Sequence, residues 1–82
     1  MNILFVCSRN IWRSPTAEAI YKNRQDLNVR SAGTEPSARI KVTAKSISWA
    51  DIILVILDIE DDYQFMDNEL IDMIRVSVDQ YL

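Results

Sequence analysis

Residues 2–15 read NILFVCSRNIWRSP, and this stretch decides the fold. Its first part, Asn2–Val6, is an apolar run without alternation, which is typical of a strand buried on both faces of a parallel sheet. Polar residues follow from Cys7 to Arg13. Ser14-Pro15 then predicts a helix start, because serine is a good N-cap and proline is favoured at the first helical position. The stretch therefore predicts a strand, a short loop and a helix in direct succession.

The rest of the chain continues this alternation. The expected strands are Val29–Ala32 and Asp51–Leu57, and the expected helices are Thr43–Trp49 and a last helix capped by Asp67. The buried stripe of the last helix is expected to contain Leu70, Ile74, Val78 and Tyr81. The order β-α-β-α-β-α predicts one three-layer α/β domain over residues 1–82, with a short parallel sheet flanked by helices.

Composition excludes several classes of protein. The 82 residues contain no histidine, one cysteine and one glycine. A Ser-His-Asp triad, a His-ligated zinc site, an internal disulfide, a Cys₄ metal site and a GxGxxG motif are therefore excluded, and we expect neither metal nor cofactor. The longest apolar run, Ile52–Leu57, is far short of the ~20 residues that a membrane span needs. With no visible export signal and a free thiol, we expect a cytoplasmic protein without membrane association.

Charge is divided unevenly along the chain. Residues 1–50 carry a net charge of +5 and residues 51–82 a net charge of −8. Two explanations stay open: solvated faces whose signs happen to separate, or a basic anion site bordered by an acidic lobe. The total of −3 and the lack of a dense Lys/Arg run argue against nucleic acid as a partner.

The segment after the first strand carries the chemistry, and we call residues 7–13 the cysteine loop. Backbone N–H groups of such a loop can form a cradle for phosphate or another oxyanion, and the following helix start adds positive dipole. The residues expected to bind phosphate are Ser8, Arg9, Asn10, Ile11, Trp12 and Arg13. Arginine can clamp two phosphate oxygens, and the same positive field favours the thiolate form of Cys7, which can attack phosphorus. Ser14 can hydrogen-bond the sulfur. A lone cysteine after a strand is more often an inert small hydrophobe, but the Cys-x₅-Arg-Ser spacing favours the functional interpretation.

If the Cys7 thiolate attacks a phosphate monoester, the reaction also needs a proton donor for the leaving oxygen. With no histidine, a carboxylate is the natural candidate. Residues Ile59–Tyr63 follow the last strand and should reach the same edge of the sheet as the cysteine loop. The alternative is a solvated acidic turn.

These residues resemble a known family. Cys7-x₅-Arg13-Ser14-Pro15 after a buried strand is similar to the signature of the low-molecular-weight protein tyrosine phosphatases, and especially of a compact bacterial subgroup. Further similar segments are Ser31–Thr34, Ala50–Val55 and Ile59–Tyr63. The resemblance implies a phosphotyrosine phosphatase I-like fold. It also implies roles for six residues: Cys7 as nucleophile, Arg13 as phosphate ligand, Asn10 and Ser14 as supports of the loop and thiolate, Asp61 as general acid and then base, and Tyr63 in the substrate cleft.

The sequence departs from the family in four places. Trp12 replaces the usual second loop cysteine, so a vicinal disulfide is impossible, and its ring is expected either to line the substrate cleft or to pack. Arg9 replaces a common loop glycine, which requires a backbone conformation without a Cβ clash. Asp62 replaces the usual proline. The chain is also truncated: the family's helix and fourth strand before the acid loop are absent, and Val55 runs directly into Ile56. Three explanations stay open: a three-stranded sheet, a segment missing from the sequence, or a gap filled by a partner chain, as in a homodimer.

The leading hypothesis is hydrolysis of phosphate monoesters, of protein phosphotyrosine or a small phosphoester, through a phosphocysteine intermediate without metal. The alternatives are an inactive phosphate- or phosphoprotein-binding module, a thiol-dependent arsenate reductase, and a phosphocarrier. A phosphocarrier has no use for the general acid expected at Asp61.

Overall fold

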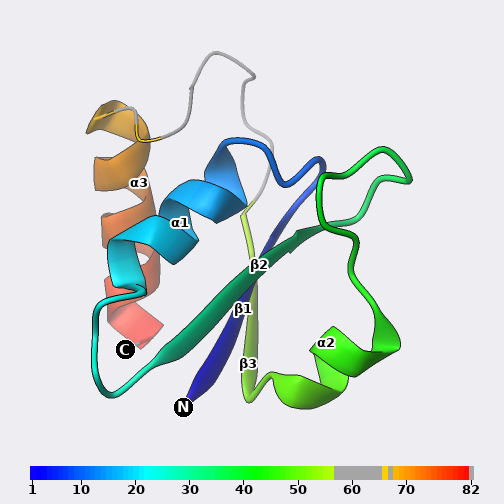
Figure 1. The fold of residues 1–82 in the computed structure, drawn as a ribbon. Helices are drawn as coiled ribbons and strands as arrows, with labels where there is room; N and C mark the ends of the chain where they lie inside the picture. Colours follow the sequence, from blue (N-terminus) through cyan, green and yellow to red (C-terminus); the bar gives the residue numbers. More distant parts are fainter. Residues whose placement is uncertain (57–65, 67, 82) are drawn as a thin grey trace.

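The computed structural model describes residues 1–56, 66 and 68–81. In chain order the elements are β1 (Asn2–Cys7), α1 (Arg13–Tyr21), β2 (Asn28–Gly33), α2 (Ala44–Trp49), β3 (Ile52–Val55), α3 (Asn68–Val78) and the 3₁₀ helix η1 (Asp79–Tyr81). The predicted order β-α-β-α-β-α is confirmed (Figure 1).

The sheet of the described residues has the strand order β2-β1-β3, and both strand pairs are parallel. In the centre, Ile3 pairs with Val29 on one side and with Ile52 on the other. At the carboxyl end, Cys7 pairs with Gly33. The central position explains the non-alternating run in β1, because both faces of that strand are covered and residues 3–7 are all buried.

Helices cover both faces of the sheet, which confirms the three-layer α/β class (Figure 1). On one face Ile3 and Phe5 contribute to a core with α1 and α3. On the other face Leu4 and Val6 form a smaller cluster with Ala32, against which Val42, Trp49 and Ala50 pack. Successive residues of β1 thus serve opposite cores, and burial of each large side chain contributes about 1.5–3 kcal/mol.

Helix α2 begins as predicted. The Thr43 hydroxyl accepts from the Ser46 backbone N–H at 3.1 Å, and the Ser46 hydroxyl accepts from the Thr43 N–H at 2.9 Å. This reciprocal pair is a capping box, and it satisfies backbone donors at the helix start that would otherwise need water.

The predicted start of α1 was wrong. The helix begins at Arg13 with Trp12 as N-cap, and no side chain caps it. Pro15 is consequently the third helical residue rather than the first. The backbone of Trp12 is already right-handed helical, which moves the start upstream and releases the Ser14 hydroxyl for another contact.

The predicted stripe of the last helix holds for three of its four residues. Leu70, Ile74 and Val78 are buried, whereas Tyr81 is 60% exposed. Tyr81 lies beyond the end of α3, in η1, where none of the residues is buried.

The connections make the carboxyl end of β1 the switch point of the sheet. The chain leaves β1 through α1 on one face to reach β2, and later passes through α2 on the other face to reach β3 (Figure 1). In open parallel sheets the crevice at such a point is where ligands bind. Cys7 is the last residue of β1, so the fold itself places the cysteine loop there.

None of the helices that the structure describes reaches the length and apolar character that a bilayer crossing requires.

Candidate active site

The cysteine loop joins β1 directly to α1. Cys7 ends the strand and Arg13 opens the helix. The two residues that the Cys-x₅-Arg spacing singled out are therefore held at the two rigid ends of one short loop. A site fixed on strand and helix ends keeps its geometry better than one carried by a free loop.

Cys7 is buried, and among the described residues Ser14 and Asn10 lie within hydrogen-bonding distance of its sulfur. The sulfur lies 3.0 Å from the Ser14 hydroxyl oxygen, and the Asn10 backbone N–H donates to it at 3.3 Å. A thiolate can only accept hydrogen bonds, so both neighbours would act as donors to the charged form. The structure thus brings Ser14 and Asn10 to the sulfur, as expected from the sequence.

Asn10 donates a hydrogen bond to the Ser14 hydroxyl oxygen. The Asn10 side-chain nitrogen Nδ2 donates to Ser14 Oγ at 2.8 Å, and both residues are fully buried. Because the hydroxyl oxygen already accepts this bond, its own proton is available for the sulfur or for the Ala32 carbonyl, 3.4 Å away.

Asn10 also supplies the unusual backbone conformation of the loop. Its φ is 56°, in the left-handed region, where asparagine is several-fold enriched among non-glycine residues. Arg9, which replaces a common loop glycine, is not among the described residues with positive φ. The substitution is accommodated because the left-handed turn lies one residue further along.

A small hollow lies at the mouth of the cysteine loop. Its volume is about 30 Å³, and it is lined by Cys7, Arg9, Ile11, Trp12 and Arg13. A single water needs roughly 10–15 Å³ of such space, so the hollow admits a small group next to Cys7.

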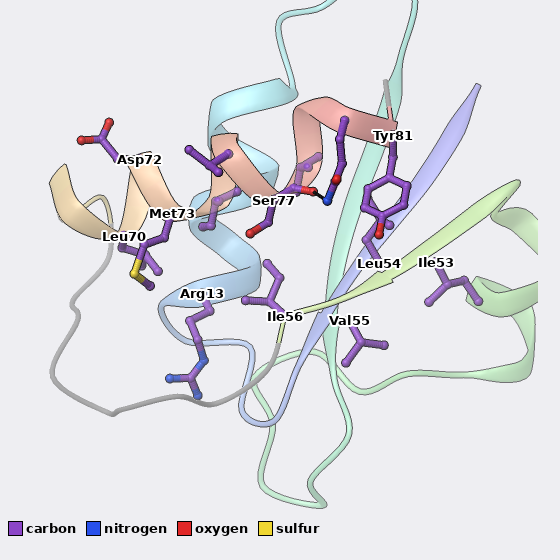
Figure 2. A pocket seen from close by; sticks show the side chains of 14 residues that line it. Arg13, Ile53, Leu54, Val55, Ile56, Leu70, Asp72, Met73, Ser77 and Tyr81 are labelled. Carbon is purple, nitrogen blue, oxygen red and sulfur yellow. Dashed lines mark hydrogen bonds between the residues drawn. The ribbon is translucent and has the colours of Figure 1, made fainter.

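Arg13 also borders a second and much larger cavity. This cavity measures about 710 Å³ and lies between β3 and α3, with Arg13 at one end (Figure 2). Most of its other lining is apolar, including Leu54, Ile56 and Leu70. Arg13 is 7% exposed, so a buried arginine lines both the small hollow and the large apolar cavity.

Two of the predicted phosphate-binding residues, Arg9 and Ile11, are exposed to solvent. The Arg9 side chain is 63% exposed and pairs with Glu35 at 3.5 Å, so its charge is partly balanced at the rim. Ile11 is 43% exposed. Exposure at the mouth suits residues that would meet the substrate, whereas Cys7, Arg13 and Ser14 form the buried floor.

Arg39 lies near the site, although no sequence pattern predicted it. Arg39 donates from Nε to the Asn10 carbonyl at 3.1 Å. It stands 29 positions away in the chain and belongs to no motif, so no sequence signal pointed to it.

The predicted general acid Asp61 and the predicted cleft residue Tyr63 lie outside the described residues. Their places relative to Cys7 therefore stay predictions. Within the described part of the chain, no group of three or more His, Cys, Asp or Glu side chains is placed to hold a metal ion.

Comparisons with known proteins found a family model, a similar protein sequence and a similar solved structure. The family model described as low molecular weight phosphotyrosine protein phosphatase matches residues 2–53. A protein-arginine-phosphatase from Bacillus subtilis (strain 168) is 46% identical over 52 residues, which cover 57% of this chain and 35% of the relative. The chain thus spans about a third of the length of that curated relative.

A solved structure is also similar. The crystal structure of a YwlE mutant from Bacillus subtilis matches with a TM-score of 0.58 and 26% sequence identity. The match covers 99% of this chain and 66% of the solved chain.

Proposed function

Because the chain belongs to the low molecular weight phosphotyrosine protein phosphatase family, we propose that it hydrolyses phosphate monoesters, with protein phosphotyrosine as the substrate class. One observation carries this proposal: the Cys7 sulfur has hydrogen-bond partners at 3.0 and 3.3 Å, and Cys7 and Arg13 line the same small hollow. No metal or cofactor is required, because the loop amides and Arg13 supply the electrostatic stabilisation on which phosphoryl transfer depends.

The first step forms a phosphocysteine. The thiolate of Cys7 attacks phosphorus, the S–P bond forms, and the bond between phosphorus and the leaving oxygen breaks. Asp61 gives its proton to that oxygen, so the product alcohol or phenol leaves neutral. Arg13 and the amides of the cysteine loop hold the three remaining phosphoryl oxygens.

The second step regenerates the enzyme. Asp61, now a carboxylate, takes a proton from water, and the water oxygen attacks phosphorus while the S–P bond breaks. The electron pair returns to the Cys7 sulfur, where the Ser14 hydroxyl and the Asn10 N–H stabilise the thiolate. Inorganic phosphate then leaves.

Substitutions at Cys7 and Asp61 test the mechanism. Cys7→Ser should abolish turnover of para-nitrophenyl phosphate, and Asp61→Asn should lower kcat by about 10²- to 10⁴-fold. The loss at Asp61 should be greater for phenyl phosphate, because phenolate is the poorer leaving group and depends more on the proton. Asp62→Asn, which makes the same change of charge at the next residue, is the matched control and should stay within a few-fold of the unsubstituted protein. Turnover that survives Cys7→Ser would overturn the proposal.

A phosphoarginine substrate is a second candidate. The segment shared with the protein-arginine-phosphatase of Bacillus subtilis supports it. The same cradle serves both substrates, because it contacts the phosphoryl group, and only the leaving atom changes from oxygen to nitrogen. A comparison of kcat/KM for matched phosphotyrosine and phosphoarginine peptides decides between the two classes.

A phosphoprotein-binding module without turnover is the third candidate. The apolar cavity of about 710 Å³ beside Arg13 favours it, since such a cavity could receive side chains flanking a phosphorylated residue. Titration calorimetry with a phosphotyrosine peptide, paired with a phosphate-release assay on the same sample, separates binding from hydrolysis. Binding without release would support the module.

A further inference from the structure

The segment that follows β2 lies directly against the cysteine loop. We call residues 34–39 the supporting loop; in Figure 1 it is the green stretch beside the blue end of β1. It donates four hydrogen bonds to four successive carbonyls of the cysteine loop. They are Thr34 N to Cys7 O at 3.0 Å, Glu35 N to Ser8 O at 2.9 Å, Arg39 N to Arg9 O at 3.0 Å and Arg39 Nε to Asn10 O at 3.1 Å.

These four bonds determine where the amides of the cysteine loop point. In a planar trans peptide the carbonyl oxygen and the next N–H lie on opposite sides of the bond. Carbonyls held outward toward the supporting loop therefore turn the following N–H groups, from Ser8 to Ile11, toward the interior of the loop. One of them can be checked directly: the Asn10 N–H, which follows the Arg9 carbonyl, points at the Cys7 sulfur at 3.3 Å.

Backbone hydrogen bonds between the residues that flank the supporting loop hold it at the end of β2. Gly33 donates to the Ile40 carbonyl at 2.7 Å, and its own carbonyl accepts from Val42 at 3.0 Å, so the chain returns to the end of β2. Gly33 also marks how closely the two loops approach each other. A Cβ there would stand 2.7 Å from the Ser8 carbonyl oxygen and 2.5 Å from the Ala38 Cβ.

Three of the four bonds come from backbone N–H groups, and the fourth comes from the Arg39 side chain. The carbonyl that it holds belongs to Asn10, the residue with φ of 56°. A left-handed backbone at a non-glycine residue costs of order 1–3 kcal/mol and persists only where surrounding contacts enforce it. The Arg39 bond is such a contact.

We propose that the supporting loop holds the cysteine loop in the conformation that binds an oxyanion, and that Arg39 is a positioning residue acting through its Nε hydrogen bond to Asn10. The identity of the ligand rests on the proposed function. Arg39 acts on the Ile11 amide, because Ile11 N–H belongs to the peptide whose carbonyl Arg39 holds.

Two substitutions of equal charge isolate this hydrogen bond. Arg39→Gln places an amide nitrogen at the same distance along the side chain as the arginine Nε, so the donor is kept and the charge is lost. Arg39→Met has a stem of similar length, with neither donor nor charge. Arg30→Met is the charge-matched control, because the Arg30 guanidinium lies 4.2 Å over the Trp49 ring and not on the cysteine loop.

The readout is binding of inorganic phosphate, measured by titration calorimetry on the full chain with Cys7 intact. The Arg39→Met protein should bind about three- to tenfold more weakly than the Arg39→Gln protein, which corresponds to the loss of one hydrogen bond. Arg39→Gln and Arg30→Met should differ from each other by less than about twofold. Equal affinities of the Gln and Met variants would overturn the proposal, since they would show that only charge matters.

A second measurement does not depend on any ligand. Hydrogen exchange at the Ile11 amide, followed by NMR without phosphate, should be faster in Arg39→Met than in Arg39→Gln, and unchanged in Arg30→Met. If the unsubstituted protein binds no phosphate, the proposed function fails while the exchange comparison still decides the role of Arg39. Identical exchange in all three variants would overturn that role even if phosphate binds.

Discussion

The side-chain amide of Asn10 donates to the Ser14 hydroxyl oxygen at 2.8 Å, and thereby leaves the hydroxyl proton for an acceptor. The nearest acceptor is the Cys7 sulfur, 3.0 Å away. The two buried, neutral side chains thus form a chain of hydrogen-bonding contacts that leads to the sulfur: Asn10 donates to Ser14, and Ser14 can donate to Cys7. In the proposed mechanism the sulfur is negative before attack and again as it leaves phosphorus, so the same hydrogen bond serves both steps.

Ser14→Ala should therefore lower kcat more than it changes KM for phosphate monoesters. A hydrogen bond to a charged group contributes about 1.5–3 kcal/mol, which corresponds to a loss of roughly 10- to 150-fold. Stopped-flow measurement of the initial burst and of the steady state would locate the loss. Ser48→Ala, an exposed serine on α2, is the control. An unchanged kcat in Ser14→Ala would rule out the role of Ser14.

Gly33→Ala should destabilise the fold. The added methyl group would meet a backbone oxygen at 2.7 Å and a Cβ at 2.5 Å, and neither is the flexible end of a side chain. Overpacking of this kind costs about 1–3 kcal/mol, measurable by urea denaturation. The double variant Gly33→Ala/Ala38→Gly should recover part of the loss, because it relieves the Cβ contact and keeps the contact with Ser8. A single variant as stable as the parent would contradict the close approach.

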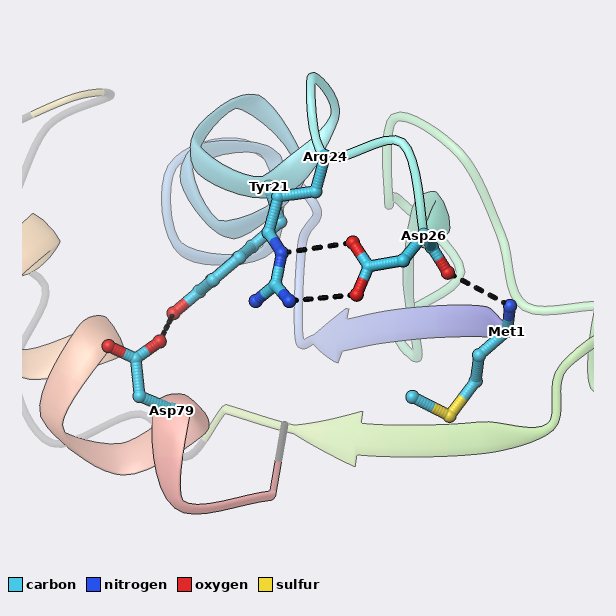
Figure 3. A network of polar contacts seen from close by, with 5 residues as sticks. All are labelled: Met1, Tyr21, Arg24, Asp26 and Asp79. Carbon is cyan, nitrogen blue, oxygen red and sulfur yellow. Dashed lines mark hydrogen bonds and ion pairs between the residues drawn. The ribbon is translucent and has the colours of Figure 1, made fainter.

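Tyr21 should make stability depend on pH in the alkaline range. Burial, and then its hydrogen bond to Asp79 at 2.5 Å, raise the pKa of the Tyr21 phenol well above its ordinary value of about 10 (Figure 3). The folded state then holds a proton that the unfolded state loses. The stabilisation is fully present below pH 10 and declines as pH rises toward the raised pKa.

Tyr21→Phe tests this linkage. It should lower the free energy of unfolding by about 1 kcal/mol at neutral pH, because one hydrogen bond is lost, and it should reduce the fall in stability above pH 10. Tyr81→Phe, at an exposed position, is the control. Equal alkaline slopes for the parent and Tyr21→Phe would contradict the prediction.

Leu70→Ala and Met73→Ala test the docking of α3 onto the sheet. Leu70 is 1% exposed within the core, whereas Met73 is 38% exposed, although both border the cavity beside β3. Leu70→Ala should cost about 2–5 kcal/mol, as large-to-small core substitutions do, and Met73→Ala much less. Thermal or urea unfolding measures both. Similar losses would mean that the cavity is closed in solution and that Met73 is buried there.

Sequence patterns predicted the features that depend on local spacing. The unbroken apolar run of β1 indicated a strand covered on both faces, and Thr43 indicated the start of α2. The succession of strand, loop and helix indicated that the cysteine loop lies at the carboxyl edge of the sheet. Each of these follows from periodicity or from the chemistry of a few adjacent residues.

The remaining features depend on contacts across the fold. Ser14 was expected both to cap the helix and to hydrogen-bond the Cys7 sulfur. The contact with the sulfur is present, whereas the cap is absent because the helix already begins at Arg13. Arg39 could not be identified, since its bond to Asn10 requires the path of a loop that no motif specifies. Tyr81 was expected in the core, but α3 ends at Val78 and Tyr81 lies in the exposed η1 that follows.

The hydrogen bonds from the supporting loop, and those among Cys7, Asn10 and Ser14, all join residues between positions 7 and 39. The bonds that shape the cysteine loop therefore lie within one continuous stretch of the chain, and they involve neither β3 nor α3. In the proposed mechanism, phosphate binding and proton donation depend on different parts of the sequence: the first on residues 7–39 and the second on Asp61.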